Sequence, residues 1–353
     1  MQKLIMKKKP FSAPEIINAV YSTSWSITRE NFISYVIRLA RTTEINAIVI
    51  DIKDYSGYMA YNTNVPKVKE YNAEYIKITN LEALIERFHQ EGIYVIARIA
   101  VFQDPVLANA RPDLAVHSKS KLSYLGSEFD SLTLWLDNLK LAWIDPSSKE
   151  AWDYNIAIAK DAASRGFDEL NFDYIRFPSD GKLSDMKFSS WDGITPRHLV
   201  LKDFFQYLRQ ELPDIKISVD LFGLVCNNYD DLGIGQIIED AFENFDYISP
   251  MVYPSHYASG FLGYSNPAQY PYQVVKDSIQ KAFRRITIFN ETFNKNAKIR
   301  PWLQDFDMGA NYDAYMVKSE IQAVQNALGD EYNGFMLWNP RNIYTEGALE
   351  LSN

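Results

Sequence analysis

Segments with strand character and segments with helix character alternate along nearly the whole chain. Eight short segments rich in β-branched and aromatic residues are predicted strands: Val20–Trp25, Ile45–Lys53, Tyr94–Val101, Glu169–Phe177, Lys216–Leu224, Tyr247–Tyr253, Lys298–Gln304 and Phe335–Asn339. Seven segments between them have the apolar spacing of helices: Arg29–Arg41, Asn80–Glu91, Ser147–Arg165, Arg197–Glu211, Ile234–Asn244, Tyr272–Arg285 and Ala314–Ala327. Eight strands separated by helices are typical of a closed (β/α)8 barrel, the TIM barrel.

The competing α/β topology is an open, doubly wound sheet. Such a sheet normally carries a glycine-rich phosphate-binding turn after its first strand, and Tyr21–Trp25 contains no glycine. No linker rich in Pro, Gly or Ser divides the chain, and no internal repeat occurs. We therefore predict an N-terminal extension, residues 1–18, followed by one α/β domain, a (β/α)8 barrel, over residues 19–353.

Two connections are longer than the few residues usual in a compact domain. One follows the third predicted strand, from Phe102 to Trp143, and the other, Pro254–Pro271, follows the sixth and contains His256. Both begin at the C-terminal ends of strands, where TIM barrels have their active sites. We expect both loops to cover the mouth of the barrel.

Composition excludes several classes of function. The chain has 36 basic and 45 acidic residues, a net charge of −9, which disfavours nucleic-acid binding. No apolar segment is long enough for a signal peptide or a membrane span, so we expect no membrane segment. The compartment stays open: cytoplasmic as written, or extracellular if a leader has been removed. The oligomeric state is not indicated.

Motifs for metal and cofactor chemistry are missing from the sequence. The four histidines are widely spaced and form no zinc-binding pattern, and there is no phosphate-binding loop, nucleophile elbow or dinucleotide fingerprint. The single cysteine, Cys226, is best interpreted as a small buried apolar residue. We predict no metal and no cofactor.

The stretch Asp168–Pro178 (DELNFDYIRFP) has the pattern of a buried strand that ends in charged residues. Asp173 lies on its polar face, and the opposite, apolar face should meet the outer helices. Asp173 should therefore point into the barrel mouth, with Arg176 close by. The alternative is an Asp–Arg pair that only caps the strand.

The next predicted strand carries a second carboxylate with the same orientation. In Lys216–Gly223 the apolar face is formed by alternate residues, which leaves Asp220 on the inward face. Asp173 and Asp220 then lie on neighbouring strands about 5 Å apart, which fits the carboxyl separation of retaining glycosidases. Two such carboxylates would raise one another's pKa and keep one protonated. The alternative is two unrelated strand-end aspartates.

Further residues are expected to bind substrate at the mouth. Strand alternation turns Asp51, Lys53 and Arg98 inward, and Asp51 with Arg98 forms either part of the site or a structural ion pair. Aromatic side chains at strand ends suit the apolar faces of sugar rings. The predicted substrate-binding set is Asp51, Arg98, Arg176, Tyr253, His256, Trp302, Asp305 and Trp338.

Six segments carry a family resemblance: Ile45–Tyr58, Tyr94–Pro105, Trp143–Pro146, Asn171–Pro178 (NFDYIRFP), Ser218–Gly223 and Asp246–Pro254. In this order they resemble the DUF4015 family, a group of TIM-barrel glycosidases distantly similar to the α-amylase-like group. The resemblance implies a retaining glycosidase with a strand-four aspartate, here Asp173, as nucleophile. The α-amylase-like group has a glutamate acid on strand five, where this chain has Asp220.

The leading hypothesis is a glycoside hydrolase acting on a polysaccharide or oligosaccharide, with Asp173 as nucleophile and Asp220 as acid and base. In this hypothesis Arg176 keeps Asp173 ionised. The alternatives are a non-catalytic carbohydrate-binding barrel, and a lyase or aldolase that uses Lys53, the only lysine that strand alternation places near the mouth.

Overall fold

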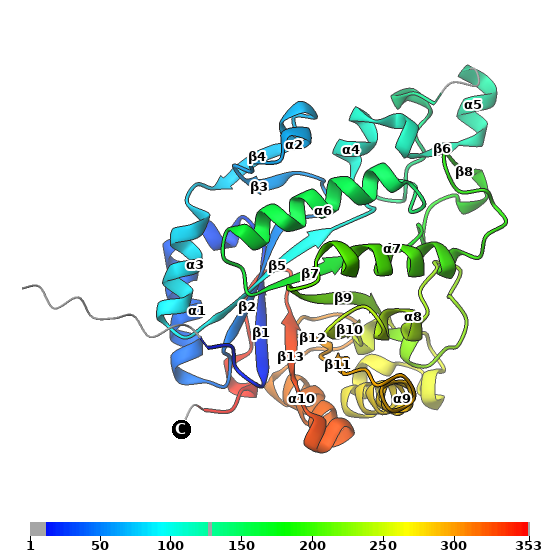
Figure 1. Ribbon diagram of the computed structural model, residues 1–353. Coiled ribbons are helices and arrows are strands. Elements are labelled where there is room, and N and C mark those ends of the chain that lie inside the picture. Colours follow the sequence, from blue (N-terminus) through cyan, green and yellow to red (C-terminus); the bar gives the residue numbers. More distant parts are fainter. Residues whose placement is uncertain (1–11, 126–128, 352–353) are drawn as a thin grey trace, which may run out of the picture.

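Eight parallel strands form a closed barrel in the computed structural model, which describes residues 12–125 and 129–351 (Figure 1). The barrel closes because β1 pairs with both β2 and β13, and the seventh strand position is divided between β11 and β12. The barrel strands are β1 (Ile17–Ser22), β2 (Ala47–Lys53), β5 (Tyr94–Ala100), β7 (Glu169–Asp173), β9 (Lys216–Phe222), β10 (Tyr247–Met251), β11 (Lys298–Ile299), β12 (Trp302–Gln304) and β13 (Gly334–Trp338). The predicted (β/α)8 barrel is confirmed.

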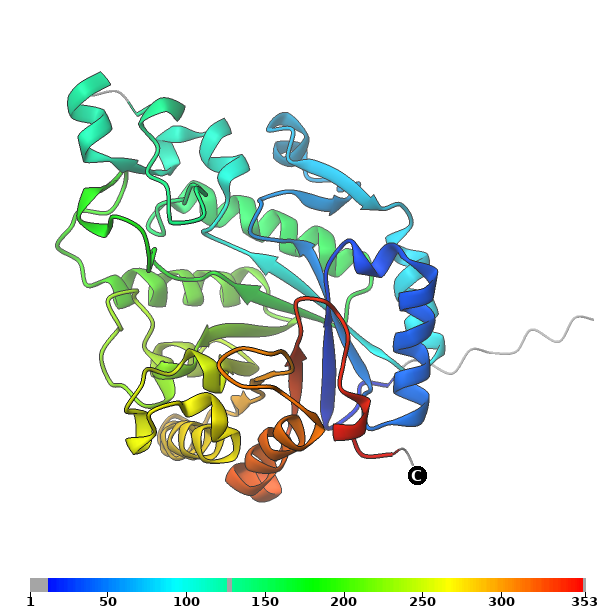
Figure 2. The same ribbon diagram turned by 180° about the vertical axis from the view of Figure 1, so that it is seen from behind.

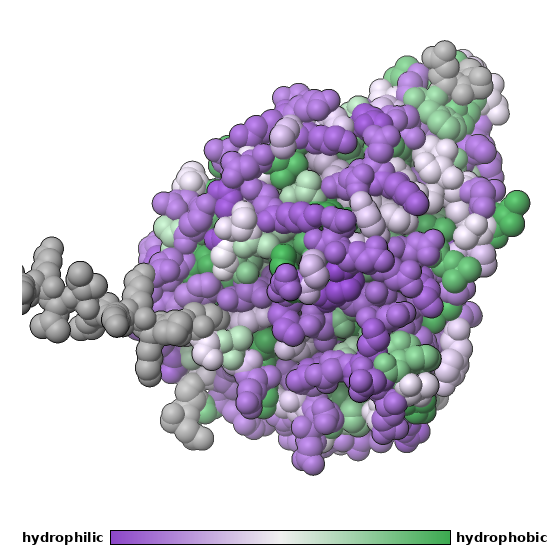
Figure 3. Space-filling model, viewed as in Figure 1, coloured by the Kyte–Doolittle hydropathy of each residue, from purple (hydrophilic) through white to green (hydrophobic). Residues whose placement is uncertain are grey.

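Helices surround the barrel, and the face crossed by α6 and α7 is mostly hydrophilic (Figures 1, 2 and 3). The helices after the barrel strands are α1 (Glu30–Thr42), α3 (Leu81–Gln90), α6 (Lys149–Ser164), α7 (Arg197–Glu211), α8 (Ile238–Phe242), α9 (Pro271–Phe293) and α10 (Ala314–Leu328). Each corresponds to a predicted helix. The main differences are that α8 is shorter and that α9 runs eight residues past the predicted end at Arg285. No helix of the described residues is long and apolar enough to cross a membrane.

The apolar core has two layers, as strand alternation requires. The larger layer lies between strands and helices and includes Ile48, Ile50 and Ile52 from β2. The smaller layer fills the barrel interior and includes Val49 and Trp302. This division turns every second strand residue inward and so decides which polar side chains reach the mouth.

The two long connections that were predicted carry short elements of their own. The connection after β5 contains α4 (Pro105–Ala110), β6 (Val116–Ser118) and α5 (Lys119–Leu125). The connection after β10 contains the 3-10 helices η6 (Pro254–His256), η7 (Phe261–Gly263) and η8 (Pro267–Gln269).

Two further excursions were not predicted. Residues 54–80, between β2 and α3, form β3 (Met59–Tyr61), α2 (Pro66–Glu70) and β4 (Glu74–Ile78), which lie at the upper edge of Figure 1. Residues 174–196, after β7, contain β8 (Met186–Phe188), which pairs with β6. We call residues 54–80 the β3–β4 excursion.

The N-terminal boundary also differs slightly from the prediction. β1 begins at Ile17, so the last two residues of the predicted extension are part of the barrel. Residues 1–11 of that extension lie outside the described part of the chain.

Candidate active site

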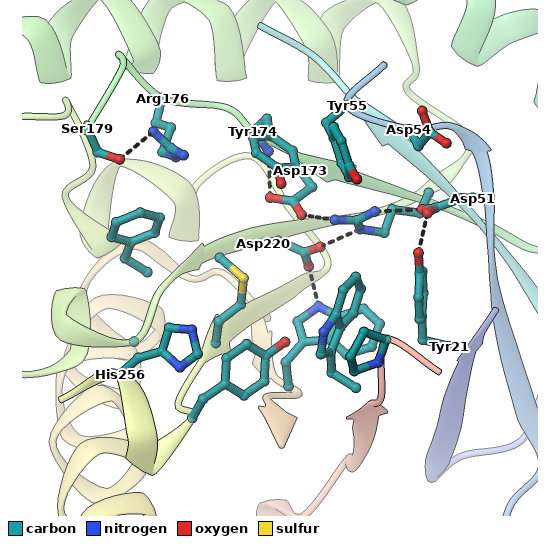
Figure 4. A pocket seen from close by; sticks show the side chains of 18 of the residues that line it. Tyr21, Asp51, Asp54, Tyr55, Asp173, Tyr174, Arg176, Ser179, Asp220 and His256 are labelled. Carbon is teal, nitrogen blue, oxygen red and sulfur yellow. Dashed lines mark hydrogen bonds and ion pairs between the residues drawn. The ribbon is translucent and has the colours of Figure 1, made fainter. Parts of the chain in front are cut away.

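The barrel strands converge on one cavity of about 810 Å³ at their C-terminal ends (Figure 4). Each of the eight strand positions contributes a side chain to its wall: Tyr21, Asp51, Arg98, Asp173, Asp220, Met251, Trp302 and Trp338. This volume lies within the range of sites that hold small ligands. The mouth of a TIM barrel is also where the fold places its chemistry.

Asp173, the last residue of β7, is held by its own turn and by a neighbouring strand. The next residue, Tyr174, has a φ of 53°, an unusual backbone conformation for a bulky side chain. This turn allows the Tyr174 N–H to donate to Asp173 Oδ1 at 2.5 Å, while Arg98 donates to Oδ2. Strained backbone of this kind is concentrated at functional sites.

Arg98 joins the carboxylates of three strands. Its guanidinium donates to Asp51 Oδ1 at 2.6 Å and to Asp173 Oδ2, and its Nε lies 3.6 Å from Asp220 Oδ2. All four side chains are almost completely buried. Tyr21 donates a hydrogen bond to the second oxygen of Asp51. The predicted Asp51–Arg98 pair is therefore present and belongs to the cavity wall.

Asp220 lies level with Asp173 on the neighbouring strand. Phe172 pairs with Val219 across β7 and β9, and Asp173 and Asp220 are the residues that follow this last pair on their strands. Asp220 Oδ1 accepts from Asn171 at 2.8 Å and from the indole N–H of Trp302 at 2.7 Å. Oδ2 has no hydrogen-bond partner among the described residues.

The surroundings of Asp220 favour its neutral form. Burial, followed by the negative charge of Asp173, raises the pKa of Asp220 to about 8, although Arg98 opposes the shift. Because Oδ1 already accepts two hydrogen bonds, Oδ2 is the oxygen free to carry the proton. A carboxyl group of this kind can act as a general acid at neutral pH.

Aromatic side chains form much of the remaining wall. Tyr21 stacks on Trp338 with ring centroids 4.0 Å apart, and Trp302 meets Trp338 edge to face at 5.7 Å. Tyr253 and His256 also line the cavity, with ring centroids 5.3 Å apart. Nine of the ten predicted site residues thus lie in the cavity wall: Asp51, Arg98, Asp173, Arg176, Asp220, Tyr253, His256, Trp302 and Trp338.

The tenth, Asp305, is placed away from the cavity wall. Its carboxylate accepts hydrogen bonds from the backbone N–H and the hydroxyl of Thr345, at 2.8 and 2.6 Å. Asp305 therefore anchors the C-terminal segment, and we withdraw it as a ligand contact. A position just after a strand end does not by itself place a side chain in the cavity. The side chain of Asp305 turns toward Thr345, which is 40 residues further along the chain.

Arg176 lines the cavity but makes its direct contacts elsewhere than at Asp173. Its guanidinium lies among the rings of Trp143 and Phe222, at 4.7 and 4.9 Å, and donates to Ser179 Oγ at 2.9 Å. Within the described residues it forms no ion pair with Asp173. Arg98, from the adjacent strand, supplies that contact instead.

Lys53 also points differently from the prediction. The pairing of β2 with β5 shifts between Asp51 and Lys53, and this irregularity reverses the alternation at the end of β2. Lys53 is fully buried on the helix side, 2.8 Å from Asp104, and does not line the cavity. A Schiff base of Lys53 with a substrate in this cavity is therefore disfavoured.

Several residues of the cavity wall were not predicted from the sequence. Tyr21 lies on the predicted first strand and could have been found by its alternation, but its bond to Asp51 joins residues 30 positions apart. Tyr55 and Asp54 belong to the β3–β4 excursion, which carried no recognised strand signal. Among the described residues, no group of three or more His, Cys, Asp or Glu side chains is arranged to hold a metal ion.

Comparison with known families decides the relationship of this chain. Residues 19–344 match the family model DUF4015, whose description is "Putative glycosyl hydrolase domain". The chain belongs to the DUF4015 family. The predicted family relationship is therefore confirmed, and no curated protein matches the chain significantly.

Solved structures similar to this DUF4015 chain share its barrel. A hypothetical protein from Ruminiclostridium thermocellum is 37% identical, with 61% of this chain and 98% of that chain covered and a TM-score of 0.51. The PgaB (BpsB) glycoside hydrolase domain from Bordetella bronchiseptica is 14% identical, with 96% and 100% covered and a TM-score of 0.63. The α-galactosidase TtGalA from Thermus thermophilus is 12% identical, with 93% of this chain and 59% of that chain covered and a TM-score of 0.54. Family and fold together support a glycoside-hydrolase-like function.

Proposed function

We propose that this protein is a glycoside hydrolase that cleaves glycosidic bonds of a poly- or oligosaccharide by a retaining mechanism with two carboxyl groups. The observation that carries the proposal is the pair Asp173 and Asp220, aligned on neighbouring strands in one aromatic-lined cavity. Neighbouring strands are about 5 Å apart, which suits the carboxyl separation of about 5–5.5 Å in retaining enzymes.

In the first step the Asp173 carboxylate attacks the anomeric carbon, and the bond to the leaving oxygen breaks. Asp220 Oδ2 gives its proton to that oxygen, and a covalent glycosyl ester with Asp173 remains. Arg98 orients Asp173 through the hydrogen bond to Oδ2. The raised pKa of Asp220 supports its role as the proton donor.

In the second step water replaces Asp173 at the anomeric carbon. The Asp220 carboxylate, now ionised, takes a proton from the water as it attacks. The ester bond breaks, the sugar leaves with its original anomeric configuration, and both carboxyl groups return to their starting states. The hydrogen bonds from Asn171 and Trp302 to Asp220 Oδ1 hold the carboxyl group in place and leave Oδ2 without a hydrogen bond among the described residues.

Two asparagine variants test these roles. Asp173→Asn keeps the size of the side chain but removes the nucleophile, so kcat should fall by about 10⁴-fold or more on every substrate. Asp220→Asn should lower kcat/KM as severely on a natural glycan and much less on an aryl glycoside, because kcat/KM reports the first step and a good leaving group needs little protonation there. The measurement is kcat and kcat/KM for both variants on a substrate found by screening cell-wall and storage polysaccharides, and on its aryl glycoside.

Melting temperatures serve as the folding control for these measurements. Retained turnover in Asp173→Asn would contradict the nucleophile assignment, and equal losses of kcat/KM in Asp220→Asn on both substrates would contradict the acid assignment. Tight glycan binding without turnover in the unmodified protein would identify a carbohydrate-binding barrel instead.

A further inference from the structure

Four large aromatic side chains lie exposed beside the cavity mouth. Trp25, in the turn after β1, is 54% exposed, and Tyr55, Tyr58 and Tyr75 of the β3–β4 excursion are 47%, 37% and 50% exposed. Aromatic rings are usually buried for much of their surface, and a contiguous exposed group indicates a binding surface. We call these four residues the aromatic platform.

The aromatic platform is continuous with the cavity. Trp25 and Tyr55 line the cavity wall, and Trp25 meets Tyr75 edge to face with ring centroids 5.5 Å apart. Tyr75 in turn lies 6.3 Å from Tyr58, which is outside the cavity. Trp25, Tyr75 and Tyr58 therefore form a path that leads from the cavity wall out onto the β3–β4 excursion.

Lys77 holds two of these rings in place. Its ammonium lies 4.8 Å from the ring centroid of Trp25 and 5.2 Å from that of Tyr75, and it donates to Ser24 Oγ at 3.0 Å. The Lys77 side chain is only 6% exposed. Trp25 and Tyr75 remain about half exposed although Lys77 lies over both rings. Rings fixed in this way lose little conformational entropy when a ligand stacks on them.

We propose that the aromatic platform binds sugar units of a glycan chain that extends beyond the cavity, so that the substrate is a polysaccharide. This inference rests on the proposed function and adds the length of the substrate to it. Sugar rings present apolar C–H faces that pack on exposed aromatic rings, and their hydroxyls need polar partners. Asp54, which lines the cavity beside Trp25 and Tyr55, offers carboxylate oxygens to those hydroxyls.

The test measures binding separately from hydrolysis. An Asp173→Asn background is run by affinity electrophoresis through gels containing soluble starch, hydroxyethylcellulose, arabinoxylan, polygalacturonate or glycol chitosan. At least one polymer should retard this protein. Adding Trp25→Ala or Tyr75→Ala should weaken the affinity for that polymer by about tenfold, the loss expected when one stacked contact is removed.

Tyr315→Ala is the matched control, because Tyr315 is 77% exposed on the outer helix α10 and is not part of the cavity wall. It should leave retardation unchanged. Retardation by none of the five polymers, or equal retardation of the parent and the Trp25→Ala/Tyr75→Ala double variant, would overturn the inference. The proposed function is tested separately, by measuring the reducing ends that the unmodified protein releases from a polysaccharide. Either proposal can therefore fail without the other.

Discussion

Asp220 acquires its chemistry from its neighbours rather than from its own side chain. Burial and the charge of Asp173 raise its pKa from an ordinary value of 3.8 to about 8. Below pH 4 the group is protonated in both the folded and the unfolded protein. Between pH 4 and 8 the unfolded chain gives up this proton and the folded one keeps it, so folding becomes less favourable as pH rises.

Asp220→Asn should remove this loss of folding stability with rising pH, because an amide cannot ionise and has the shape of the protonated acid. We expect the variant's melting temperature, relative to that of the unmodified protein, to rise by at least ~2 °C between pH 4.5 and pH 8.5. Turnover by the unmodified protein should decline as pH rises through about 8, since the general acid is then lost. A difference in melting temperature that does not change with pH would contradict the raised pKa of Asp220.

At the scale of the element, the end of β2 shows how one irregularity in strand pairing redirects a side chain. Lys53 forms a fully buried pair with Asp104 and also donates to the carbonyl oxygen of Ala100 at 2.6 Å. Asp104 Oδ1 accepts from the Leu107 N–H at 2.8 Å and so caps α4. One buried lysine thereby ties β2 to β5 and to the start of the long connection over the mouth.

Lys53→Met should lower the free energy of unfolding by about 3 kcal/mol or more, because Asp104 is left buried without its counter-charge. The control is Lys160→Met, which removes the same charge from the exposed pair of Lys160 and Glu211 and should cost less than about 1 kcal/mol. Chemical denaturation of both variants measures the difference. Equal losses would mean that the Lys53 pair is no more important than a surface ion pair.

At the scale of the whole molecule, the barrel depends on a close approach between its first and last strands. Gly334 pairs with Ile17 across β13 and β1, and its φ is 99°. A Cβ atom built at Gly334 would lie 2.1 Å from the carbonyl oxygen of Ile17. Any larger residue must therefore push the two strands apart at the point where the barrel closes.

Gly334→Ala should destabilise the protein by at least about 3 kcal/mol, since backbone strain and a backbone clash occur together. Gly92→Ala is the control: Gly92 also has a positive φ, 75°, but a Cβ there meets nothing within 4 Å, so only about 1 kcal/mol should be lost. Urea midpoints compare the two variants. If Gly334→Ala loses no more stability than Gly92→Ala, the contact between β1 and β13 can widen without a cost in free energy.

Local pattern in the sequence was sufficient for the barrel and for four charged residues of the cavity wall. The alternation of strands and helices depends on residue spacing, and strand alternation follows from the two-residue period of a strand. These two rules placed Asp51, Arg98, Asp173 and Asp220 inside the mouth, where the structure has them. They apply because each strand end lies on the same rim of a parallel barrel.

Only the tertiary structure decided how those side chains pair. Arg98, not Arg176, contacts Asp173, because side-chain reach across neighbouring strands outweighs nearness in sequence. Lys53 turned outward at an irregularity in strand pairing, and Asp305 turned toward Thr345, a partner 40 residues away. The aromatic platform likewise joins Trp25 to Tyr75 through folding of the β3–β4 excursion. Contacts between distant segments depend on the path of the chain in space, which residue spacing within a single strand does not encode.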